Sequence, residues 1–108
     1  MNPKPYILSE QAENDLARIY AYIARDNLDA AERMLDKLLS ACELLTDNPR
    51  IGQYRADLTP LPVRFWLVHP RYFLIYRGES PVEIVRVLAA NMDIARELAG
   101  ESTIRDIE

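Results

Sequence analysis

The fold is decided by residues 72–89, which read YFLIYRGESPVEIVRVLA. Two runs rich in β-branched and aromatic residues, 72–77 and 82–89, flank a short polar spacer that contains Gly78 and Pro81. Such runs favour strands, and a spacer of this length is typical of a hairpin. A third run of the same kind, residues 63–68, precedes them across the turn-like spacer 69–71. We therefore predict a three-stranded antiparallel meander.

Upstream of this meander, the hydrophobic period changes to that of a helix. Between residues 10 and 25 the apolar side chains recur at spacings that place them on one helical stripe. Ser9 is the expected N-cap of this helix. The opposite face, which we expect to be solvated, carries Asp15, Arg18, Arg25 and Asp26.

A second apolar stripe follows between Ala31 and Leu45. We place Asp29 as the N-cap of this helix, with Glu32 three residues later in the position of a capping box. The helix should stop before Pro49, because a residue that precedes proline avoids helical backbone angles. The two helices then form an antiparallel hairpin.

The ends of the chain complete the element order. Residues 5–8 form a short apolar run that we interpret as an edge strand, where proline is tolerated. Residues 91–98 favour a last short helix with Gly100 as its stop, and we expect the charged tail 101–108 to be mobile. Helical stripes must bury against the apolar face of the sheet. We predict one domain over residues 1–100, of α+β class: a two-layer βααβββ fold with a helical hairpin packed on a small, mainly antiparallel sheet and a short C-terminal helix.

Composition excludes several classes of function. The chain has 108 residues with one Cys and one His, which excludes a disulfide framework, an all-His metal site and a zinc site with two or more thiolates. We expect no metal and no cofactor. No stretch is long and apolar enough to span a membrane, and the N-terminus lacks the apolar region of a signal peptide, so we expect a cytoplasmic protein. The net charge of −4 argues against a general nucleic-acid binder.

Positive charge is nevertheless concentrated in the predicted sheet. From residue 50 to residue 86 there are six Arg against three acidic residues, a local charge of +3. Pairing across the spacer 78–81 places Phe73, Arg77, Arg86 and Leu88 on one face, together with Ile75, Val82 and Ile84. On an apolar face, two Arg side chains either extend along the surface so that their charges reach solvent at the rim, or they bind a partner protein. We interpret this face as a surface that binds a partner. For Arg64 and Arg71 two interpretations stay open: charges at the rim of the sheet, or binding residues.

Four other side chains have simpler interpretations. Cys42 lies on the apolar stripe of the second helix and is expected to be an inert core thiol. His69 in a turn is expected to be exposed. Phe65 and Trp66 are adjacent in one strand and point to opposite faces, so both faces of the sheet should be covered.

The order of these phrases resembles the RelE/ParE toxins of type II toxin–antitoxin systems, and the ParE branch most. The matching phrases are YILSEQAENDL (residues 6–16), IYAYI (19–23), LLTDNPRIG (44–52), YFLIYR (72–77) and VEIVRVL (82–88), followed by Met92 and Asp93. The resemblance covers about residues 5–99. It implies a toxin that inhibits DNA gyrase by binding it, and a cognate antitoxin, ParD-like or other, that wraps the toxin in a hetero-oligomer.

One position departs from the wider family. Many relatives carry His directly after the Val-Leu of the last main strand, and this chain has Ala89 there. Cleavage of mRNA by the RelE branch needs a proton donor or acceptor near the scissile phosphate. We therefore expect no intrinsic catalytic site and no sequence-specific nucleic-acid binding. The alternatives are a RelE-type ribosome-dependent endoribonuclease and a non-toxic, antitoxin-binding relative. The expected antitoxin- or target-binding residues are Arg64, Arg71, Phe73, Arg77, Arg86, Leu88, Met92 and Asp93.

Overall fold

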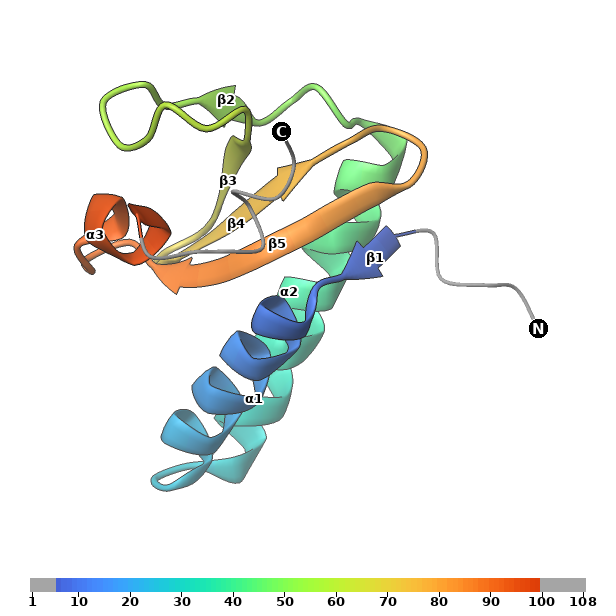
Figure 1. The fold of residues 1–108 in the computed structure, drawn as a ribbon. Coiled ribbons are helices and arrows are strands. Elements are labelled where there is room, and N and C mark those ends of the chain that lie inside the picture. Colours follow the sequence, from blue (N-terminus) through green and yellow to red (C-terminus); the bar gives the residue numbers. More distant parts are fainter. Residues whose placement is uncertain (1–5, 100–108) are drawn as a thin grey trace.

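The computed structural model describes residues 6–99, which form three helices and five strands (Figure 1). In chain order these elements are β1 (Tyr6–Leu8), α1 (Glu10–Ala24), α2 (Leu28–Asp47), β2 (Gln53–Tyr54), β3 (Arg64–Val68), β4 (Tyr72–Arg77), β5 (Val82–Ala89) and α3 (Ile94–Ala99). The predicted α+β class is confirmed. No helix within residues 6–99 has the length and hydropathy needed to cross a membrane.

All five strands belong to one sheet, in the order β1-β5-β4-β3-β2. Strand β1 runs parallel to β5, and the other neighbours are antiparallel. The meander of β3, β4 and β5 is therefore confirmed, and β1 is an edge strand as predicted. The other edge, β2, was not predicted, because two residues inside a Gly- and Pro-containing loop carry no periodic signal.

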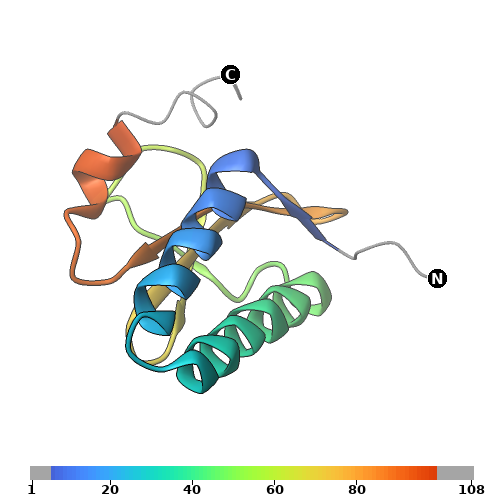
Figure 2. The same ribbon diagram turned by 90° about the horizontal axis from the view of Figure 1, so that it is seen from below.

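The helical hairpin covers one face of the sheet. Helices α1 and α2 lie side by side and antiparallel, and their connected end extends away from the strands (Figures 1 and 2). The core between them and the sheet contains Leu16, Leu38, Cys42, Leu74 and Tyr76. Removing such apolar surface from water is the main stabilising contribution to a domain of this size.

Side chains cap the N-termini of both hairpin helices, α1 and α2. The cap of α1 is the predicted residue, whereas the cap of α2 is a different one. The Ser9 hydroxyl accepts a hydrogen bond from Ala12 N (3.0 Å) and donates one to the Val85 carbonyl (2.8 Å), so the predicted cap also joins α1 to β5. The prediction of Asp29 as the second cap is wrong. Asn27 caps α2 by accepting from Ala30 N (3.0 Å), which leaves Asp29 in the first turn, where a negative charge suits the helix dipole.

The second face of the sheet is covered at one end by α3. Ile94 and Leu98 pack there against Val63, Phe65 and Ile75, with Leu58 and Leu61 at the margin. Phe65 lies on this face and Trp66 on the hairpin face, so the expectation of two covered faces is confirmed. Helix α3 begins three residues later than predicted, since Met92 N bonds back to Ala89 O in a turn. The predictions for Gly100 and the tail 101–108 lie outside the described residues.

Because of a β-bulge in β5, some residues of this strand lie on a different face of the sheet from the one predicted. Ile75 is opposite Arg86, but the next residue, Tyr76, is opposite Ile84. The extra residue, Val85, reverses the alternation in β5. Val82 and Ile84 consequently pack with the hairpin, while Val85 joins the α3 side. The prediction that Val82, Ile84 and Arg86 share one face is therefore wrong.

Candidate functional site

The predicted partner face is open over only part of its area. Leu88 is buried beneath α3, and Phe73 is half-buried and packs edge-on against Phe65 with 5.5 Å between ring centroids. Beside them Leu67, which is opposite Phe73 in the ladder, is 42% exposed. A shallow pocket of about 410 Å³ opens here, and its lining also includes Ile51 and Trp66. The uncovered apolar surface thus lies on β3 and β4, toward β2.

Arg86 is held in a buried ion pair. Its Nε lies 2.8 Å and its Nη2 3.1 Å from the two carboxylate oxygens of Asp15, a bidentate arrangement that suits a guanidinium. Asp15 also accepts from Val87 N (2.9 Å) and from Arg18. Nη2 of Arg86 lies 3.6 Å from Glu97 of α3. With a residue exposure of 7%, Arg86 bridges the hairpin and α3 instead of presenting a free charge.

Three further arginines of the segment 50–86 also have carboxylate partners. Arg77 donates to Glu83 (2.8 Å), and its Nη1 is buried with no hydrogen-bond partner within the described residues. The exposed pairs Arg50–Glu79 and Arg55–Asp57 close at 3.0 and 2.8 Å. These three acidic residues are already counted in the local charge of +3, and Asp15 of α1 neutralises Arg86 in addition, so Arg64 and Arg71 carry the remaining excess.

Arg64 anchors the loop that follows α2. Its guanidinium stacks over the Tyr54 ring at 4.3 Å and donates to the Gly52 carbonyl at 2.9 Å. The buried Tyr76 hydroxyl accepts from Gly52 N and donates to Pro49 O, both at 2.8 Å. Burial raises the pKa of Tyr76 above its usual value. This network fixes the start of β2 on the sheet.

The last predicted residues gather at the end of β5 nearest α3. The Arg71 carbonyl accepts from Ala90 N (2.7 Å), and the Arg71 side chain is exposed with no ion pair among residues 6–99. Met92 is 40% exposed, and Asp93 accepts from Arg96 N at the start of α3. Ala89 lies on the wall of a groove between α1 and β5. His69 is exposed in its turn, as expected.

Cys42 is buried between the hairpin and the sheet, as predicted. Burial raises the pKa of its thiol to about 12, so the thiol is protonated at neutral pH. A protonated, inaccessible thiol is a poor nucleophile.

Sequence reasoning missed the two polar residues that organise this region. Asp15 was placed on the solvated face of the first helix, yet it is only 2% exposed. Tyr76 is not among the predicted site residues, although its hydroxyl holds Gly52 and Pro49. The sequence offered one signal for the second case: Gly52 is one of only three glycines, and a glycine often marks a close approach of another group.

Comparison with known proteins places most of the chain in one family. Residues 6–94 match the family described as the ParE toxin of the type II toxin–antitoxin system parDE. Toxin ParE1 of two Mycobacterium tuberculosis strains is 32% identical over 94 residues, covering 86% of this chain and 96% of the relative. Toxin ParE3 of Caulobacter vibrioides is 29% identical over 93 residues, covering 85% of this chain and 92% of the relative.

Proposed function

Because the chain belongs to the ParE toxin family of type II toxin–antitoxin systems, we propose that it inhibits DNA gyrase by binding it and that a cognate antitoxin neutralises it. The observation that carries this proposal is the match over nearly the whole fold, from β1 to the start of α3. ParE toxins pair with cognate antitoxins. Inhibition of gyrase would take place in the cytoplasm, where we expect the protein to act.

The charge arrangement supports inhibition by binding over phosphodiester cleavage. Cleavage would need cations aimed at the developing charge on the phosphate and a proton donor nearby. Here Arg86 and Arg77 are instead engaged by Asp15 and Glu83. Ala89 has no group that can transfer a proton.

We assign partner binding to the accessible members of the predicted set. Arg71 and Met92 lie beside the end of β5, with Asp93 next to Met92 in the chain, and Phe73 borders the uncovered sheet surface. Arg64 is half-buried beside the loop that follows α2, where it stacks on Tyr54. Arg86 and Leu88 act from within the fold, by holding α1, β5 and α3 together. The segment 91–99 is the proposed target element, since it is anchored by Ile94 and Leu98 and leaves Met92 exposed.

The experiment is expression without antitoxin, with supercoiling by gyrase and translation measured in parallel. We expect a loss of supercoiling while translation of a reporter mRNA persists. Cleavage of mRNA on the ribosome would instead support the RelE-type enzyme. Normal growth with supercoiling intact would support a non-toxic relative, and either result would contradict the proposal.

A further inference from the structure

The two helices of the hairpin enclose a groove that lies apart from the residues described above. It has a volume of about 620 Å³, which is larger than the pocket on β3 and β4. Six residues line it: Leu16, Ala17 and Tyr20 of α1, and Glu32, Leu35 and Asp36 of α2. All of them belong to helices, and the connected end of the hairpin extends away from the strands (Figures 1 and 2). We call this feature the hairpin groove.

The floor of the hairpin groove is apolar, and its centre is open. Leu16 is buried and Tyr20 and Leu35 are half-buried, whereas Ala17 is exposed. Because an alanine side chain ends at Cβ, Ala17 leaves room for a side chain of a partner. Covering this apolar surface with apolar surface of another protein removes both from water, which favours binding. The groove thus has the properties of a docking site for an apolar side chain.

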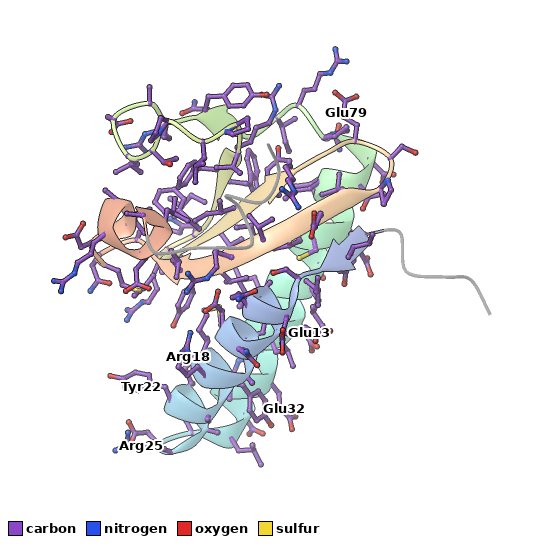
Figure 3. The ribbon with its side chains drawn as sticks, viewed as in Figure 1. Glu13, Arg18, Tyr22, Arg25, Glu32 and Glu79 are labelled. Carbon is purple, nitrogen blue, oxygen red and sulfur yellow. The ribbon has the colours of Figure 1, made fainter. Side chains whose placement is uncertain are left out.

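Carboxylates border the groove on both helices. Glu32 and Asp36 are exposed on α2, and Glu13, which lies one turn before the groove on α1, is exposed as well. Figure 3 shows Glu13 and Glu32 on one side of the hairpin, away from Arg18 and Arg25. None of the three carboxylates takes part in an ion pair within residues 6–99. Their charges are therefore available to a partner.

The spacing of these charges favours a cationic partner. Glu32 and Asp36 are four residues apart on the same face of α2, where like charges repel each other. A cation bound beside both carboxylates would remove this repulsion. Arg33 and Lys37 follow them directly in the chain, but adjacent residues of a helix do not face each other, and neither one lines the groove. In addition, residues 10–47 contain nine acidic and four basic residues, a local charge of −5.

A helix fits the hairpin groove better than a strand does. Both walls are helices, whose backbone groups are bonded internally, so the groove offers no free sheet edge for an added strand. The lining follows one turn of each helix, residues 16–20 and 32–36. A third helix that lies along this seam can place apolar side chains into the groove and charged side chains over its border.

We propose that the hairpin groove docks a basic, amphipathic helix of DNA gyrase. This inference rests on the proposed function and adds a second contact surface to segment 91–99. Gyrase acts on DNA, a polyanion, and proteins that bind DNA carry clusters of Lys and Arg. The helix should place Lys or Arg beside Glu32 and Asp36, and an apolar side chain over Ala17. Complementary charges of this kind raise the specificity and the rate of association.

The test is the affinity of the purified chain for the gyrase holoenzyme. The variant is the double substitution Glu32→Lys with Asp36→Lys, which reverses two charges at exposed positions of the groove. We expect its Kd to rise by about tenfold or more, since like charges that face each other across an interface oppose binding. The matched control is Asp26→Lys with Asp47→Lys, the same change in net charge at exposed residues outside the groove. Its Kd should stay within about threefold of the wild-type value.

A second pair of variants tests the apolar part of the groove without any change in charge. Ala17→Trp fills the centre of the groove from an exposed position, and we expect gyrase to bind about tenfold more weakly here too, because the new side chain would clash with the docked helix. The control is Ser40→Trp, which adds the same side chain at an exposed residue of α2 that does not line the groove. Its Kd should stay within about threefold of the wild-type value.

Three results would overturn the assignment of the hairpin groove. The first is unchanged gyrase affinity in either groove variant. The second is an equal loss in the matched control, which would indicate unspecific effects. The third is a loss of affinity for the antitoxin that restores growth on co-expression, with gyrase affinity intact, which would make the antitoxin the occupant. Hydrogen exchange on the complex of wild-type chain and gyrase gives a readout independent of variants: protection should appear in residues 13–20 and 32–36, and its absence would contradict the proposal.

Failure of the proposed function has a different signature. In that case the wild-type chain itself binds no gyrase or leaves supercoiling intact. An error confined to the hairpin groove leaves both wild-type activities in place and appears only in the comparison of the variants or in the exchange pattern.

Discussion

Asp15→Asn is the substitution that most directly tests the role of the buried ion pair. The carboxylate is 3% exposed and faces the Nε and Nη2 of Arg86 at 2.8 and 3.1 Å. The amide keeps the volume of the side chain and can still accept from Val87 N, but it leaves the buried guanidinium without its counter-ion. Removing one partner of a buried pair costs about 3–5 kcal/mol. We expect the lower end of that range, because Glu97 at 3.6 Å provides part of the compensation.

The assay is urea unfolding of the whole chain. In thermal unfolding, measured in parallel, a loss of about 3 kcal/mol corresponds to a fall of roughly 12–24 °C in Tm for a domain of this size. Glu97→Gln is the control, since that side chain is 40% exposed and should cost under about 1 kcal/mol. Adding Arg86→Met to Asp15→Asn removes the uncompensated charge and should regain about 2 kcal/mol. The reasoning is refuted if Asp15→Asn costs under about 1 kcal/mol, or if the double variant is no more stable than the single one.

Three further predictions concern other parts of the fold. Gly52→Ala should cost about 1–3 kcal/mol in thermal unfolding, since the new Cβ would lie 2.5 Å from the Tyr76 hydroxyl oxygen, and a wild-type Tm would contradict this. The pKa of the Cys42 thiol rises from its usual 9.0 to about 12 in the fold, so the contribution of this thiol to stability should be constant below pH 9 and should fall above it, when only the unfolded chain releases this proton. The fall attributable to Cys42 is about 1.4 kcal/mol per pH unit between pH 9 and 12, and the difference between wild type and Cys42→Ala should show it; parallel curves would count against the burial argument. Leu98→Ala should cost about 2 kcal/mol in urea unfolding, because Leu98 is buried against the sheet, whereas the exposed Arg96→Ala should cost under about 0.5; equal costs would mean that α3 adds little stability.

Local periodicity was enough to predict every element of residues 6–99 except β2. The runs 72–77 and 82–89 are strands with the boundaries that the sequence indicates, and Ser9 caps α1 as expected. These features depend on residues a few positions apart, so the chain itself displays them. The order of its phrases was also enough to predict the family, which the match over residues 6–94 confirms.

Only the tertiary structure decided which charged side chains are buried in ion pairs and which are accessible. A single bulge at Val85 reverses the alternation of β5, and no local pattern signals it, because bulges are set by how two strands pair. Arg86 stays on the face of Ile75, as predicted, yet it bonds to Asp15, a residue 71 positions away that the helical pattern places in solvent. A charged side chain can be buried only where an opposite charge lies beside it. That proximity is set by packing between segments that are distant in the sequence, not by local periodicity.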